Sequence, residues 1–197
     1  MKAERGEEFL DEFRSAGALL EGHFLLSSGR HSAAYLQCAR VMMDPARGAR
    51  LCAALADRVR AAGIAADLCV SPAMGGVIVG YETARQLGLP SIFVERVEGE
   101  FTLRRGFEIA PGARVLVVED VVTTGLSSRE CMAAVDAAGG RPVGLACLVD
   151  RSGGGAEFDV PFVPLIRLDV PSYAPDAIPP ELAALPAVKP GSRMLRS

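Results

Sequence analysis

Two adjacent carboxylates stand beside a cluster of hydroxyl side chains near the middle of the chain. The apolar run 115–118 predicts a strand buried on both faces, and Glu119 and Asp120 are expected to end it. After two valines comes a cluster of hydroxyl side chains around a glycine, which consists of Thr123, Thr124, Gly125, Ser127 and Ser128. A helical pattern begins there, and the N-terminus of a helix offers free N–H groups to a phosphate. Carboxylates can accept hydrogen bonds from vicinal sugar hydroxyls. The segment therefore predicts a sugar-phosphate site, and the alternative is that these residues only cap the helix.

The motif resembles a known phosphate-binding sequence. Residues 117–127 (Val-Val-Glu-Asp-Val-Val-Thr-Thr-Gly-Leu-Ser) resemble the phosphoribosyl pyrophosphate (PRPP) motif of type I phosphoribosyltransferases. The resemblance implies that the ribose and the 5-phosphate are held by Glu119, Asp120, Val121, Val122, Thr123, Thr124, Gly125, Leu126 and Ser127. It also implies an α/β fold. A central, mostly parallel sheet would be flanked by helices, with a small N-terminal hood of helix and antiparallel strands.

A second strand end carries successive glycines. Residues 71–76 (Ser-Pro-Ala-Met-Gly-Gly) follow the short apolar run 67–70. Glycines allow consecutive N–H groups to converge on an anion. Beside the first motif, this segment predicts a pyrophosphate loop, and the alternative is an ordinary helix start.

A third strand end leads into the charged segment 95–106. Its two glycines and many charges predict an exposed, mobile excursion. Arg96, Arg104 and Arg105 could reach phosphate oxygens. The alternative is a solvated hairpin that binds nothing.

A fourth strand end presents Asp150 and Arg151, before the glycines 153–155. An arginine there can hold a planar carboxylate through two parallel hydrogen bonds. A surface ion pair is the alternative.

The whole set resembles the orotate branch of the family. The segment 22–32 with Tyr35 resembles the N-terminal signature of orotate phosphoribosyltransferases, and 148–151 resembles their base-recognition strand. The resemblance implies transfer of ribosyl 5-phosphate from PRPP to orotate in pyrimidine synthesis, giving orotidine 5′-phosphate and pyrophosphate. It assigns orotate to Thr123, Arg151 and Ser27, and pyrophosphate to Ala73, Met74, Gly75, Gly76 and Arg96.

The same resemblance implies a cofactor and a partner. The family uses Mg²⁺, which Glu119 and Asp120 would meet indirectly because this ion keeps several waters and takes substrate oxygens. A mobile loop closes over the site of a neighbouring subunit, so a homodimer with shared active sites is implied.

The chain departs from its branch in its lysines. Many orotate enzymes carry lysines at the positions of Ser27, Gly75, Val97 and Glu100, and a histidine in the mobile loop. Here the only lysines are Lys2 and Lys189. We expect Arg104 or Arg105 of the mobile loop to supply the missing charge.

Composition limits the other possibilities. A net charge of −3 predicts no nucleic-acid partner and no anionic membrane surface. No apolar run approaches the ~20 residues of a membrane span. The five cysteines have no metal-ligand spacing and indicate buried thiols in a reducing cytoplasm.

The chain is expected to form one domain over residues 1–197. A hood (1–43) should contain a helix over 5–20 and antiparallel strands at 22–29 and 32–38. Alternating helices and strands follow in the α/β core (44–168), with binding residues at the carboxyl ends of the strands. The core should begin with a helix capped by Asp44 and end with an edge strand at 161–168. The proline-rich tail (169–197) is expected to be irregular, and no functional residue is assigned to it.

Two other functions share the central motif. A purine-base phosphoribosyltransferase would need a different pocket in place of Arg151 and 22–35. A non-catalytic PRPP-sensing regulator would explain the missing lysines, but it predicts a nucleic-acid-binding module or a basic face.

Overall fold

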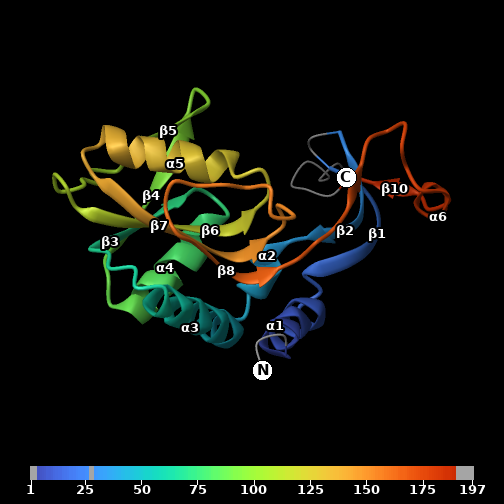
Figure 1. Cartoon of the computed structure of the whole chain (residues 1–197), viewed down its shortest axis with the longest axis horizontal. Helices are drawn as coiled ribbons and strands as arrows, with labels where there is room; N and C mark the ends of the chain where they lie inside the picture. Colours follow the sequence, from blue (N-terminus) through green and yellow to red (C-terminus); the bar gives the residue numbers. More distant parts are fainter. Residues whose placement is uncertain (1–3, 27–28, 190–197) are drawn as a thin grey trace.

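The computed structural model describes residues 4–26 and 29–189, with side chains from Phe9 onward (Figure 1). Two sheets organise these residues. The larger sheet has the strand order β5-β4-β3-β6-β7-β8, and the smaller one has the order β10-β1-β2-β9. The α/β architecture expected from the sequence is confirmed.

The larger sheet is parallel except at one edge. Its strands are β3 (Leu68–Pro72), β4 (Ser91–Val97), β5 (Glu100–Leu103), β6 (Arg114–Val122), β7 (Arg141–Asp150) and β8 (Phe162–Arg167). β5 pairs antiparallel with β4, and all other neighbours pair in parallel. β8 is the edge strand predicted at 161–168, and it tolerates Pro164 there because an edge strand leaves part of its backbone unpaired.

Helices cover both faces of this sheet (Figure 1). α5 (Leu126–Ala137) lies on one face, and α3 (Pro45–Ala61) and α4 (Gly76–Leu87) lie on the other. The predicted start of α3 is confirmed, since Asp44 Oδ1 accepts hydrogen bonds from the backbone N–H of Ala46 (2.9 Å) and Arg47 (3.3 Å). α4 ends at Gly88, whose φ of 74° suits glycine.

The central strand β6 explains why the core has two halves. Residues 115–118 are fully buried, and successive side chains point to opposite faces. Leu116 and Val118 pack on the side of α3 and α4, while Val115 and Val117 pack beneath α5. All five cysteines are buried and free, as expected.

The N-terminal hood differs from expectation in its helix. α1 covers Glu4–Ser15 and ends before Gly17, whereas a helix was predicted as far as residue 20. Leu19 and Leu20 instead begin β1 (Leu19–Leu25), which pairs antiparallel with β2 (His31–Leu36). Two adjacent leucines fit a helical stripe and a strand equally well, so spacing could not separate them. The short helix α2 (Cys38–Val41) leads from β2 to α3.

As far as residue 189, the proline-rich tail contains short regular elements, which corrects the prediction of an irregular tail. It contains β9 (Ser172–Tyr173), α6 (Pro180–Ala183) and β10 (Ala187–Val188). β9 pairs with β2 and β10 pairs with β1, so the tail supplies both outer strands of the smaller sheet. Two-residue strands have no readable period, and their partners are remote in sequence.

No helix within 4–26 and 29–189 is both long enough and apolar enough to cross a membrane. In Figure 1 the carboxyl ends of the large sheet's central strands face the smaller sheet.

Candidate active site

The acidic pair lies within β6, and not beyond its end as the sequence suggested. β6 continues to Val122 because its backbone keeps pairing with β7, at Val121 with Val149 and at Val122 with Asp150. Backbone pairing does not depend on the side chain, so two carboxylates did not stop the strand. Glu119 and Asp120 are therefore held on a rigid element.

Burial makes these carboxylates unusual. Glu119 is only 6% exposed, and its Oε2 accepts a hydrogen bond from the backbone N–H of Asp120 (3.3 Å). Burial first, and then the negative charge of Asp120, raise the pKa of Glu119 to about 8. Burial also raises the pKa of Asp120. Near neutral pH the pair can thus both donate and accept hydrogen bonds, as binding of sugar hydroxyls requires.

The glycine loop 73–76 packs directly against the acidic pair. A Cβ added to Gly75 would lie 2.6 Å from Asp120 Oδ2, and one added to Gly76 would lie 3.1 Å from the carbonyl oxygen of Val118. The loop joins β3 to α4, and its Ala73–Met74 peptide bond is cis. Close approach of loop and strand is thus the reason for glycine here. The structure brings the predicted pyrophosphate segment to the predicted ribose segment.

The hydroxyl turn begins α5. Gly125 has a φ of 76°, and a Cβ there would meet the Phe158 ring at 2.7 Å. Thr124 Oγ1 accepts a hydrogen bond from the backbone N–H of Leu126 (3.3 Å). Thr123 and Thr124 are exposed. The other N–H groups in the first turn of α5 have no partner within the helix and are available to an anion.

Arg151 faces a cleft between the two sheets. The cleft has a volume of about 790 Å³, and it is lined by Leu25, Leu26, Arg30, Tyr35, Leu36, Asp120, Val121, Thr123, Thr124, Arg151, Ser152, Gly155, Val170, Ser172 and Lys189. Arg151 Nε is buried without a hydrogen-bond partner among the described residues, and burial lowers the pKa of this guanidinium. Asp150 pairs instead with Arg167 (3.4 Å). The arrangement leaves Arg151 free to hold a planar anion.

The arginine-bearing segment forms a hairpin. β4 and β5 pair from Val94–Leu103 to Val97–Glu100, so much of the expected excursion is regular β structure. Arg96 forms an ion pair with Glu130 of α5, and its guanidinium stacks on the Phe101 ring at 4.1 Å. Arg105 donates two hydrogen bonds of 2.8 Å to Glu95. The side chain of Arg104 forms no hydrogen bond or ion pair with residues 4–26 or 29–189.

Comparison with known proteins settles the family. The phosphoribosyl transferase domain family matches residues 43–166. The orotate phosphoribosyltransferase of Rhizorhabdus wittichii is 63% identical over 191 residues, which cover 95% of this chain and 96% of the relative. That of Sphingopyxis alaskensis is 64% identical over 189 residues, which cover 95% and 96%. The chain belongs to the orotate phosphoribosyltransferase family.

Solved structures agree with this family assignment. Orotate phosphoribosyltransferase from Aeropyrum pernix is 27% identical with a TM-score of 0.68, covering 80% of this chain and 92% of that one. The Mycobacterium tuberculosis enzyme, solved in complex with PRPP, is 27% identical with a TM-score of 0.63, covering 82% and 94%.

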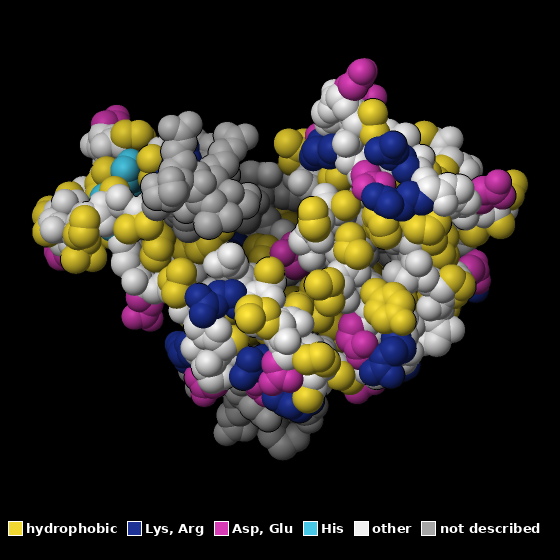
Figure 2. Space-filling model, turned by 180° about the vertical axis from the view of Figure 1, so that it is seen from behind, with side chains coloured by type: hydrophobic (Ala, Val, Ile, Leu, Met, Phe, Trp, Pro, Cys, Tyr) yellow, Lys and Arg dark blue, Asp and Glu magenta, His cyan; other side chains and the backbone are white. Residues whose placement is uncertain are grey.

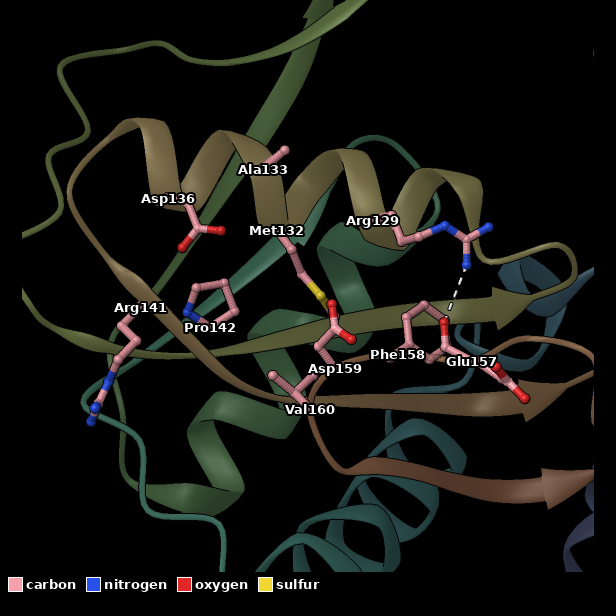
Figure 3. A pocket seen from close by; sticks show the side chains of 10 residues that line it. All are labelled: Arg129, Met132, Ala133, Asp136, Arg141, Pro142, Glu157, Phe158, Asp159 and Val160. Carbon is pink, nitrogen blue, oxygen red and sulfur yellow. Dashed lines mark hydrogen bonds between the residues drawn. The ribbon is translucent and has the colours of Figure 1, made fainter.

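Another hollow of the phosphoribosyltransferase fold contains none of the predicted site residues. It has a volume of about 750 Å³ and lies between α5, the start of β7 and the segment 157–160 (Figure 3). Arg129 Nη1 donates a hydrogen bond to the carbonyl of Glu157 there (3.4 Å), and acidic and basic side chains are mixed. Its place away from the strands' carboxyl ends, and its lack of the hydroxyl turn, leave the other cleft as the active-site candidate.

The cleft of this family member also contains charged and polar residues that were not predicted as site residues from the sequence. Arg30, Ser172 and Lys189 line it, although the tail had received no chemistry. Arg30 donates hydrogen bonds to the hydroxyl (2.8 Å) and carbonyl (2.5 Å) of Ser172, which ties the tail to the loop before β2. The pairing of β9 with β2 and of β10 with β1 brings Ser172 and Lys189 to the cleft, and no local sequence pattern predicts these two pairings. Ser27, expected to meet orotate, lies outside the described residues.

The side chains that could coordinate a metal ion are few. Residues 4–26 and 29–189 contain no group of three or more His, Cys, Asp or Glu side chains that could hold an ion. The acidic pair alone supplies two carboxylates.

Proposed function

We propose that this protein transfers the ribosyl 5-phosphate of PRPP to orotate, giving orotidine 5′-phosphate and pyrophosphate in pyrimidine synthesis. Relatives above 60% identity over nearly the whole chain support this function. The observation that carries it in the structure is Arg151. Its guanidinium, whose Nε is buried without a hydrogen-bond partner among the described residues, shares one cleft with the hydroxyl turn and with Asp120.

Different residues of the site bind different groups of the two substrates. Glu119 and Asp120 form hydrogen bonds with the ribose hydroxyls. The turn 123–127 binds the 5-phosphate at the N-terminus of α5. Arg151 and Thr123 meet the orotate carboxylate, with Ser27 assigned to the same substrate. The loop 73–76 receives pyrophosphate, for which its contact with Asp120 is the support.

The reaction breaks the bond between C1 and the pyrophosphate oxygen and forms a bond from C1 to a ring nitrogen of orotate. Positive charge develops on the sugar and negative charge on the leaving group. Buried carboxylates beside the ring favour the former electrostatically. Orotate brings its own nucleophilic nitrogen, so the protein mainly positions the reactants, which can supply ~7–11 kcal/mol in favourable cases.

The acidic pair fits a Mg²⁺ ion that is held through the substrate. Two carboxylates leave most coordination positions to water and to the oxygens of PRPP. When bound with PRPP, the ion would neutralise charge on the departing pyrophosphate. Glu119 and Asp120 would orient its waters.

A homodimer would bring the hairpin of one subunit to the cleft of the other. The side chain of Arg104 is exposed and without a partner among the described residues, which suits a cation that acts across an interface. Three exposed apolar residues support a contact surface on α4 and the loop before it. Met74 is 85% exposed, Ile78 56% and Tyr81 64%, at helical spacing; we call them the α4 patch.

A panel of bases tests the proposed function. The protein is incubated with PRPP and Mg²⁺ and offered orotate, adenine, guanine, xanthine or uracil in parallel, with an EDTA control. We expect orotate to be the only base consumed, as monitored by the loss of its ultraviolet absorbance. In the EDTA control, little orotate should be consumed. Consumption of a purine would favour the purine-base enzyme instead. PRPP binding without turnover would favour the sensing regulator.

A further inference from the structure

The tail carries a lysine to the substrate cleft. Lys189 follows β10 directly, and β10 pairs in parallel with β1, with Val188 opposite Phe24. This pairing places Lys189 beside the end of β1, where Leu25 and Leu26 line the same cleft. Lys189 is one of only two lysines in the chain.

Contacts upstream hold the tail in this register. His23, which is buried, forms a hydrogen bond from Nδ1 to the carbonyl of Leu185 (3.0 Å). Leu182 of α6 is also buried. A side chain, a strand pairing and an apolar contact therefore position the residue that follows. The place of Lys189 is built into the fold.

The charges around the cleft favour an anion. Arg30, Arg151 and Lys189 line it, and Asp120 is the carboxylate among its lining residues. The guanidinium of Arg30 is occupied by Ser172. Arg151 and Lys189 have no side-chain hydrogen bond or ion pair with the described part of the chain. Two cationic side chains without protein partners at one cleft favour the binding of an anionic ligand.

We propose that Lys189 is a substrate-binding residue that contacts the orotate and ribose-phosphate side of the site. The proposal rests on the proposed function and adds the tail to it. An ammonium offers three donors to carboxylate or phosphate oxygens. The residues that line the cleft with Lys189 include Thr123, Thr124 and Arg151, and none of the loop 73–76. Lys189 therefore binds orotidine 5′-phosphate, which carries both the carboxylate and the 5-phosphate, and does not bind pyrophosphate.

Calorimetry with the two products separates these ligands. Wild type, Lys189→Gln, Lys189→Arg and Glu181→Gln are titrated with orotidine 5′-phosphate and, separately, with pyrophosphate and Mg²⁺. Glu181 is exposed in the same tail and lies outside the cleft, so its variant is the matched control. We expect Lys189→Gln to weaken nucleotide binding at least about tenfold and pyrophosphate binding by less than about twofold. Lys189→Arg should recover most of the loss, and Glu181→Gln should bind as wild type does.

A second measurement observes the lysine directly. Reductive ¹³C-methylation labels only Lys2, Lys189 and the N-terminal amine, and loss of one NMR signal in Lys189→Arg assigns Lys189. Its signal should shift on addition of orotidine 5′-phosphate and stay in place with pyrophosphate.

The outcomes distinguish the two proposals. Wild-type nucleotide affinity in Lys189→Gln, or equal loss of both ligands, would overturn the role of Lys189 while the proposed function stands. Failure of the wild-type protein to bind orotidine 5′-phosphate at all would overturn the proposed function, and this inference with it.

Discussion

Glu119 is the residue at which stability and function conflict most directly. A carboxyl group is buried there beside a second one, with one backbone hydrogen bond in support. A core position of β6 would be more stable with an apolar side chain. The arrangement is understandable if sugar hydroxyls satisfy the pair when substrate binds. Function thus explains a feature that folding alone would disfavour.

We predict that this carboxyl makes the free protein less stable as pH rises. Its pKa is raised to about 8 in the folded state, from an ordinary value near 4.5. Its ionisation therefore costs no stability below pH ~4.5, and the penalty grows until pH passes ~8, reaching a few kcal/mol. Glu119→Gln should flatten the fall in unfolding free energy between pH 5 and pH 8.5, as measured by urea denaturation.

The exposed Glu108→Gln provides the control for this pH series and should follow the wild-type curve. Parallel curves for wild type and Glu119→Gln would show that the buried carboxyl does not titrate in this window.

At the scale of elements, two rigid connections form the site. The loop 73–76 and the turn 123–125 each join a strand to a helix, and each uses glycine where a side chain would collide. At Gly75, the atom with which an added Cβ would collide is a carboxylate oxygen of Asp120. This glycine therefore positions a binding group as well as its own backbone.

Gly75→Ala should reduce turnover more than stability. Its new Cβ would lie 2.6 Å from Asp120 Oδ2 and displace that carboxylate. Gly140→Ala is the matched control, because its Cβ would meet Ile109 and Val135 at 2.9 Å, in the core. We expect Gly140→Ala to cost ~1–3 kcal/mol of stability and to keep kcat/KM near wild type, while Gly75→Ala loses kcat/KM at unchanged unfolding temperature. Equal kcat/KM for the two variants would contradict the role of Gly75.

The hairpin sharpens the expectation about the missing lysines. Arg105 donates two hydrogen bonds to Glu95, whereas the side chain of Arg104 forms no hydrogen bond or ion pair within the described chain. We predict that Arg104→Ala lowers kcat by about tenfold or more, the effect of losing one charged hydrogen bond, and that Arg105→Ala lowers it less. Steady-state kinetics with saturating PRPP would measure both. Full turnover in both variants would show that no hairpin arginine replaces the lysines.

The elements with a clear period were predictable from the sequence, and the short ones were not. The buried run 115–118, the capped start of α3 and the alternation of strands and helices along the core followed from patterns that side chains carry. The extension of β6 through Glu119 and Asp120 did not, because backbone pairing extended the strand past its apolar run. Arg151 could be placed in the site from its position at a strand end. Lys189 could not, because a distant strand decides its place.

At the scale of the whole molecule, the cleft is a product of both sheets. The large sheet supplies the hydroxyl turn and Arg151, and the small sheet supplies Tyr35 and the tail. The face seen in Figure 2 shows hydrophobic side chains spread across its middle. A further subunit would complete this arrangement if the hairpin reaches across.

The α4 patch should hold the proposed dimer together. We predict that Ile78→Glu gives a monomer in sedimentation velocity at micromolar concentration, because a charge would be buried at the contact. Leu185→Glu alters an equally apolar exposed residue on the tail and should leave the assembly state unchanged.

Mixing tests whether the sites are shared between subunits. Glu119→Gln and Arg104→Ala, each impaired alone, should regain turnover together if the hairpin of one subunit serves the cleft of the other. A wild-type protein that sediments as a monomer would contradict the dimer, and no gain on mixing would contradict shared sites.

The central claim is that the cleft holding Arg151 binds orotate next to PRPP. The most direct measurement is kcat/KM for orotate in wild type and in Arg151→Ala, together with KM for PRPP. Loss of a bidentate, charge-assisted contact should lower kcat/KM for orotate about 100-fold and change KM for PRPP by less than about threefold. Wild-type kcat/KM for orotate in Arg151→Ala would contradict the account.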